Sequence, residues 1–161
     1  INPFLVETRT LYKKEYQLAK KAVQILESRF EIPIPEGEIG FIAFHIHGAI
    51  NNSEVSKTVK NTSIIKDLVA KVEEELGAEL EYDSLNYARL VNHLRFALES
   101  IESRENNTNP LLDNIKKDFK KTYKIAGKLA EIIESRFDYQ VPEDEKGYLA
   151  LHLHRLKRDF N

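Results

Sequence analysis

The sequence predicts an all-α protein, and three observations support that fold class. Apolar residues recur every three or four positions along most of the 161 residues, the spacing that puts them on one face of a helix. Glycine (6) and proline (5) are few, and the prolines stand at expected helix starts or between helices. One helical pattern also occurs twice. We therefore expect helical bundles with short connections.

The strongest feature of the sequence is this internal repeat. Asn2-Pro3-Phe4-Leu5 recurs as Asn109-Pro110-Leu111-Leu112, an offset of 107 residues (109 − 2), and 20 of the 46 positions from 2 to 47 are identical at that offset without a gap. His45 and His47 fall on His152 and His154. The two segments should therefore share a fold.

The repeat divides the chain into a partial and a complete unit. Residues 55–108 have no counterpart before Asn2, so we expect residues 1–54 to be the C-terminal half of a first unit. Residues 55–62 are polar and are expected to form a linker, and residues 63–161 a complete second unit. The chain opens inside a repeat without a Met, so we expect the parent protein to extend N-terminally. The pattern predicts three helices in the first unit and five in the second.

The helices can be placed in order. Apolar stripes mark helices over 64–76, 83–103 and 121–137, the second with Asp83 or Ser84 as its N-cap. Asn109 is expected to cap a helix with Pro110 in its first turn, and acids after Pro142 open the last one. Segment 40–47 could be a buried strand, but Pro35 followed by acids favours a helix in both copies.

Composition excludes several classes of protein. Lys and Arg total 24 against 26 Asp and Glu, which gives no basic footprint for nucleic acid. The absence of cysteine excludes disulfides and thiolate chemistry and fits a cytoplasmic protein. No apolar run approaches the roughly 20 residues of a membrane helix, and no signal peptide is evident.

Four of the five histidines form the two His-x-His pairs. Helical residues two apart point about 200° from each other, so such a pair cannot hold one metal ion from one face. A metal site would need the strand alternative. A catalytic base would need a nucleophile, an oxyanion hole or a Gly-rich loop, and none is evident. We therefore expect no metal, no cofactor and no enzymatic activity.

A third interpretation of the histidines is phosphate acceptance, because neutral imidazole is a good nucleophile toward an activated phosphoryl group. His93 has Arg89 four residues before it and Arg104 eleven residues after it, both on the same helical face. His152 has Arg155 one turn ahead. A purely structural interpretation stays open, with one histidine of each pair in the core and the other at the surface.

Three motifs carry a resemblance to a known family. They are the Asn-Pro-Leu-Leu opening, the segment Arg-Leu-Val-Asn-His-Leu-Arg-Phe-Ala over 89–97, and Glu-Lys-Gly-Tyr-Leu-Ala-Leu-His-Leu-His over 145–154. Together they resemble the phosphotransferase-system regulation domain, or PRD. That domain occurs in tandem in bacterial transcriptional antiterminators of the BglG, LicT, SacY and GlcT type. The resemblance covers nearly the whole chain.

The resemblance implies a five-helix bundle with two regulatory histidines in each unit. It assigns phosphorylation to His93, His152 and, in the first unit, His45, with His154 and His47 as secondary candidates. The implied donors are the phosphocarrier HPr and a sugar-specific enzyme II. Phosphorylation is expected to shift a dimer arrangement and so RNA binding by an N-terminal domain that these residues do not contain.

Two further expectations concern assembly. The partial first unit should expose apolar residues such as Ile25, Leu26, Phe41 and Phe44 unless a second chain covers them, which predicts a homodimer, with exchanged helices as one form. His93 and His152 are expected to face one another within the second unit or across that interface. The alternatives are the same domain in a DNA-binding activator, a purely structural dimerisation module, and a metal-dependent enzyme.

Overall fold

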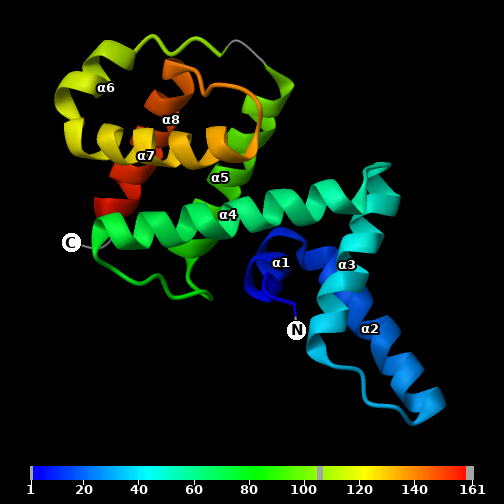
Figure 1. Cartoon of the computed structure of the whole chain (residues 1–161). Coiled ribbons are helices and arrows are strands. Elements are labelled where there is room, and N and C mark those ends of the chain that lie inside the picture. The colour runs from blue at the N-terminus through cyan, green and yellow to red at the C-terminus, as the bar shows by residue number, and fades with distance from the viewer. Residues whose placement is uncertain (1, 105–106, 159–161) are drawn as a thin grey trace. The chain divides into compact units, whose positions relative to one another are not determined.

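The structure is a computed structural model that describes residues 2–104 and 107–158, and within them it is all-helical, without strands. The helices (Figure 1) are α1 (Leu5–Leu11), α2 (Lys13–Phe30), α3 (Glu36–Asn51), α4 (Val55–Leu76), α5 (Leu85–Ser103), α6 (Leu112–Asp118), α7 (Lys120–Arg136) and α8 (Glu143–Arg158). This confirms the predicted fold class, and segment 40–47 lies inside α3. Among the described residues no helix is long and apolar enough to span a membrane.

The chain divides into two compact units, unit 1 (residues 1–66) and unit 2 (residues 67–161), and the division falls inside α4. Residues 55–62, which were expected to form a linker, are helical and make up the first turns of α4. Thr58 and Thr62 are buried, and the Thr62 hydroxyl donates to the Thr58 carbonyl oxygen at 2.7 Å. A hydroxyl satisfied inside its own helix lets a polar residue occupy a buried face.

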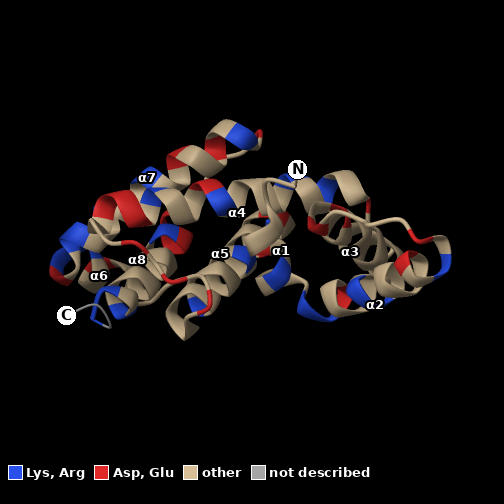
Figure 2. Ribbon diagram, turned by 90° about the horizontal axis from the view of Figure 1, so that it is seen from below, with Lys and Arg blue, Asp and Glu red and all other residues tan. Residues whose placement is uncertain are grey.

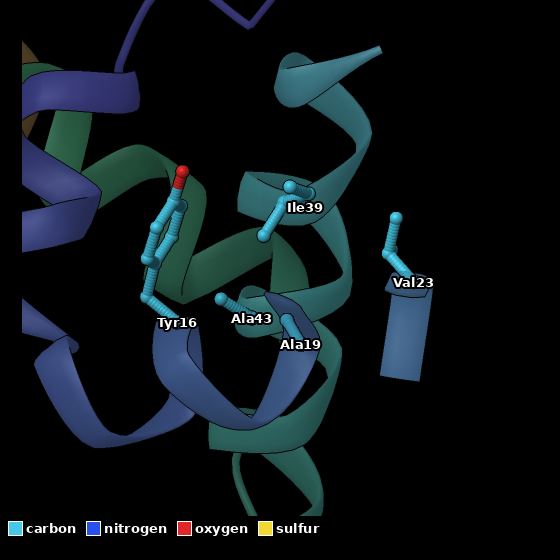
Figure 3. Close-up of a cluster of buried hydrophobic side chains, with 5 residues drawn as sticks. All are labelled: Tyr16, Ala19, Val23, Ile39 and Ala43. Carbon is cyan, nitrogen blue, oxygen red and sulfur yellow. The ribbon is translucent and has the colours of Figure 1, made fainter. Parts of the chain in front are cut away.

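Unit 1 has its core between α2 and α3. Tyr16, Ala19 and Val23 of α2 are buried with Ile39 and Ala43 of α3 (Figure 3). Ile25 and Leu26 are exposed as predicted, at 58% and 41%.

The expectation that Phe44 is exposed is wrong, and Phe41 is half-buried. Phe44 is fully buried because the Tyr12 ring, at the junction of α1 and α2, packs edge-on against it with ring centroids 5.9 Å apart. Tyr12 thus covers an aromatic residue that the sequence pattern left without a partner.

Unit 2 packs α8 against α5, α6 and α7. Ser84 is the N-cap of α5, and its hydroxyl oxygen accepts a hydrogen bond from the Tyr87 amide at 3.1 Å, as predicted. The cap expected at Asn109 is wrong, because α6 begins at Leu112 with Leu111 as N-cap. The backbone N–H of Asn109 donates to Asp144 Oδ1 at 2.9 Å, which ties this segment to the start of α8.

The two units repeat the same contacts as well as the same residues. Tyr16 donates from its hydroxyl to Glu36, and Tyr123 does the same to Glu143. Glu27 accepts a hydrogen bond from the Ile34 amide at 2.8 Å, and its counterpart Glu134 accepts one from the Val141 amide at 2.8 Å. The conserved spacing within the repeat therefore reflects bonds that close the same loops between helices.

A close approach between a loop asparagine and a helix glycine also occurs in both units. A Cβ added to Gly40 would lie 2.3 Å from Asn2 Nδ2, and one added to Gly147 would lie 2.7 Å from Asn109 Nδ2. Real Cβ atoms do not approach other atoms so closely. The Asn-Pro motif and the glycine that follows each acidic helix start are thus the two sides of one contact.

We expect Gly147→Ala to destabilise the protein by about 1–3 kcal/mol through overpacking. Asn109 cannot swing away, because Asp144 and the Leu111 amide hold its backbone and side chain. The matched control is Gly127→Ala in α7, where nothing lies within 4 Å of the added Cβ and helix propensity predicts a gain of up to about 1 kcal/mol. Urea unfolding measures both, and a Gly147→Ala variant as stable as the Gly127→Ala variant would contradict the contact.

Candidate functional site: the His93–His152 pair

Two of the predicted acceptor histidines stack on one another inside unit 2. His93 lies in α5 and His152 in α8, with ring centroids 3.8 Å apart and planes inclined by 19°. Both side chains are partly buried. The structure therefore brings together, within one chain, residues 59 positions apart in the sequence (152 − 93).

The environment keeps both imidazoles uncharged at neutral pH. Burial, the His93 ring and the Arg155 charge lower the pKa of His152 from 6.5 to about 4. Burial, followed by the charges of Arg155 and Arg89, lowers the pKa of His93 as well. Burial and nearby positive charge both disfavour the cationic form of a histidine. Each ring thus keeps a nitrogen lone pair available at physiological pH.

A cavity of about 230 Å³ opens on one side of the pair. Besides the two rings, its walls are Asn86, Arg89, Leu90, Arg155 and Leu156. Arg89 and Arg155 are exposed, so their guanidinium groups can meet an incoming anion. Two of the three predicted arginines thus line the cavity beside the histidines.

A second cavity of about 230 Å³ opens on the other side of the pair and has the opposite character. Glu145, which is 5% exposed, lines it. The Ser100 hydroxyl donates to Glu145 Oε1 at 2.8 Å, and Asn107 Nδ2 donates to the same oxygen at 3.2 Å. A carboxylate fixed at this wall disfavours an anion there, so the arginine side is where a phosphate can bind.

Sequence reasoning missed Asn86 and Glu145. Each lies seven residues before one of the histidines, Asn86 before His93 and Glu145 before His152. Seven residues are close to two helical turns, so both face the same way as the histidine that follows. That spacing was the available signal.

The structure does not bring the third predicted arginine, Arg104, to the pair. Arg104 is the C-cap of α5 in a left-handed conformation (φ 53°) and lines neither cavity. The prediction considered the face of the helix but neglected the distance along its axis. Eleven residues span roughly 16 Å of helix. The charge of Arg104 instead acts on Tyr139. Burial raises the pKa of Tyr139 to about 12, and the positive charge of Arg104 opposes this rise.

The remaining histidines lie away from this pair. His45 is exposed on α3. His47 Nδ1 lies 3.0 Å from Glu15 Oε1, and its ring lies 4.4 Å from the Tyr12 ring. His154 packs against Phe119, with ring centroids 4.2 Å apart. In the described parts of the chain no three His, Asp or Glu side chains are arranged to hold a metal ion.

Comparison with known proteins identifies the family. The model of the PRD domain matches residues 1–49 and 66–156, so the chain belongs to the PRD family of regulatory, non-enzymatic domains.

Its relatives include the PtsGHI operon antiterminator of Bacillus subtilis (strain 168), 38% identical over 157 residues, covering 96% of this chain and 56% of that protein. The transcription antiterminator LicT of the same strain is 30% identical over 158 residues, covering 96% of this chain and 57% of LicT. Protein GlcT of Staphylococcus aureus (strain Newman) is 30% identical over 162 residues, covering 99% of this chain and 57% of GlcT. The chain thus spans little more than half the length of these relatives.

The lowered pKa of His152 predicts a loss of stability on mild acidification. The His152 imidazole takes up a proton near pH 4 in the folded protein and near pH 6.5 in the unfolded chain. The free energy of unfolding therefore falls as the pH drops from 6.5 to 4. We expect a loss of about 1–2 kcal/mol, moderated by the partial exposure of the pair. The carboxyl of Glu143, with its pKa near 2, contributes only at lower pH.

Urea unfolding at several pH values tests this prediction. His152→Gln should flatten the pH dependence of the free energy of unfolding above pH 4.5, whereas His154→Gln should leave this dependence unchanged. An unaltered slope in His152→Gln would show that the pair is not the group being titrated.

Proposed function

We propose that the chain is the phosphorylation-controlled module of a bacterial transcriptional antiterminator. His93 and His152 are the acceptors of unit 2, and His45 is the corresponding acceptor of unit 1. The observation that supports this proposal is a stacked pair of uncharged imidazoles beside two arginines. A site with two lone-pair donors and two exposed arginines on its open side suits an incoming phosphoryl group.

The transfer needs only groups that this site supplies. A neutral imidazole nitrogen donates its lone pair to phosphorus and forms the N–P bond, while the bond from phosphorus to the donor breaks and its electron pair returns to the donor. Arg89 and Arg155 stabilise the charge on the phosphoryl oxygens. Because the low pKa of His152 keeps its nitrogen free, no general base is required.

Phosphorylation would change how α5 and α8 pack. A phosphate adds about 1.5 to 2 negative charges, and rings whose centroids lie 3.8 Å apart leave no room for it between them. The Glu145 carboxylate repels it from the second cavity. The phosphorylated ring must therefore turn toward the arginines, which biases the helix pair toward another arrangement.

The donors are proposed to be HPr and a sugar-specific enzyme II, and the regulated activity to be RNA binding by another domain of the full-length protein in the cytoplasm. Family membership and the two relatives named antiterminators support this assignment over a DNA-binding activator. The chain itself has no excess of basic residues.

An uncovered apolar face on α2 supports a homodimer. Leu18 and Leu26 are 51% and 41% exposed, whereas their counterparts Ile125 and Ile133 are 7% and 0% exposed. The same helix face is thus buried in unit 2 and open in unit 1. We propose that a second copy of the chain covers it.

Incubation with phosphoenolpyruvate, enzyme I, HPr and enzyme II should add phosphoryl groups that intact-mass spectrometry can count. His93→Gln, His152→Gln and His45→Gln should each lower the count, whereas His154→Gln should not. The double variant Arg89→Gln/Arg155→Gln should slow uptake by at least about tenfold, the effect of one lost charge-assisted contact. Its matched control is Arg29→Gln/Arg136→Gln, at positions outside the site.

The outcome that contradicts the proposal is equally definite. Unchanged uptake in all three histidine variants, or no uptake by the parent chain, would leave the pair a structural element of a dimerisation module.

Sedimentation at micromolar concentration should show a dimer. Ile25→Lys/Leu26→Lys places two charges on the exposed face of α2 and should shift the protein to monomer, whereas Lys20→Gln/Lys21→Gln on the same helix should not. A monomeric parent chain would contradict the homodimer.

A further inference from the structure

A second hollow lies in unit 2, at the other histidine of the His-x-His motif. It measures about 570 Å³ and lies where α6 meets α7 and near the C-terminal end of α8. Phe119, Thr122 and His154 line it together with a set of cations, Lys117, Lys120, Lys121, Lys157 and Arg158. Figure 2 shows basic residues gathered at the α6–α7 junction and at the end of α8. The proposed phosphorylation site uses none of these residues.

The charge of this pocket runs against that of its surroundings. Residues 67–161 contain 15 Lys and Arg and 19 Asp and Glu, a net charge of −4. Among the residues that the structure describes, the pocket lining has five cations and one anion, Asp118, which sum to a charge of +4. Like charges gathered in one concave place repel one another, and a bound anion relieves that repulsion.

The start of α7 adds to the positive potential. Its N-cap is Phe119, which offers no side-chain hydrogen bond to the first turn. The first backbone N–H groups of a helix have no partner within the helix, and they carry the positive end of the helix dipole. In this 17-residue helix they belong to Lys120, Lys121 and Thr122, which all line the pocket.

Unit 1 has the same aromatic–histidine pair, but there a carboxylate of the chain itself lies beside the histidine. Tyr12 and His47 correspond to Phe119 and His154, with ring separations of 4.4 and 4.2 Å. There the Glu15 carboxylate lies 3.0 Å from His47 Nδ1. Burial raises the pKa of Glu15, but the hydrogen bond and charge of His47 hold it below the ordinary value. The carboxylate of Glu15 is therefore an internal anion.

Unit 2 has lost that anion and gained cations around its place. Thr122 stands where unit 1 has Glu15, and Lys157 and Arg158 stand where it has Ile50 and Asn51. The Thr122 hydroxyl donates to the Phe119 carbonyl oxygen at 3.2 Å and brings no charge. The aromatic–imidazole wall is kept while the negative charge must come from outside the chain.

From this contrast we propose that the His154 pocket binds a small phosphorylated molecule, with the phosphate among the lysines and the organic part against Phe119. The volume falls within the range of small-molecule sites, about 300–1,000 Å³. Several ammonium groups and free helix N–H groups are the donors that hold a phosphate monoester.

The test is an NMR titration of the unphosphorylated chain with glucose 6-phosphate as a representative phosphate monoester, at constant ionic strength. Inorganic phosphate is the second probe and glucose the neutral control. We expect saturable shifts at the amides of Lys120–Thr122 and at the His154 ring with glucose 6-phosphate. Inorganic phosphate should shift the same signals with weaker affinity, and glucose should shift none.

Two variants test the assignment independently. Lys121→Gln/Lys157→Gln should weaken binding by about tenfold or more, and Thr122→Glu, which restores the internal anion of unit 1, should abolish it. Because Thr122 is buried, the lysine variant stands if Thr122→Glu fails to fold. The control Lys20→Gln/Lys21→Gln, on α2, should bind as the parent does.

The proposal is overturned by a lack of saturable binding to both phosphate probes, or by unchanged affinity in the lysine variant. Neither result depends on the acceptor role of His93 and His152, since no phosphoryl donor is present.

Discussion

The geometry of unit 2 depends on the absence of a side chain at Gly147. The Asn109 side chain occupies the space where a Cβ would stand, with Leu112 Cδ1 3.0 Å from the same point. This contact draws the start of α8 close to the loop before α6, and Asp144 fastens it through the Asn109 amide. His152 follows five residues later on the same rigid helix, so its stacking on His93 follows from where α8 enters. Unit 1 repeats the contact with Asn2 and Gly40, which explains why these residues, rather than the surrounding surface, are the ones the repeat preserves.

The two cavities beside the stacked pair differ in charge, with arginines in one and a glutamate in the other. Burial and the charges of Arg155 and Arg89 lower the pKa of His93, whereas Glu145 lines the other cavity and accepts hydrogen bonds from Ser100 and Asn107. The two uncharged rings supply no negative charge that could balance these arginines. The charges on the two sides would thus direct the proposed phosphoryl group toward the arginines.

Sequence reasoning predicted what periodicity and repetition encode and missed what depends on depth and distance. The helical class, the Ser84 cap and the meeting of His93 with His152 follow from spacing and resemblance. The helix over 55–62 was missed because Thr58 and Thr62 are polar, yet each hydroxyl donates to the carbonyl oxygen four residues before it. Arg104 was misplaced because a helical wheel has no axial dimension, and Phe44 because only the fold shows that Tyr12 covers it. Glu145 was hidden because its partners Ser100 and Asn107 lie far from it in the sequence.

The geometry that argues against a metal site also explains why one short motif serves two places. Residues two apart on a helix point about 200° from each other. In α8 this sends His152 toward His93 on α5 and His154 toward Phe119 at the α6–α7 junction. A pair that cannot chelate one ion can therefore place one imidazole at each of two separate surfaces of the bundle. The two histidines belong to one helix, so a rotation of α8 that moves His152 also moves His154 in the wall of the second pocket. Occupation of the basic pocket and modification of the stacked pair would thus act on the same element, and each would bias its position for the other.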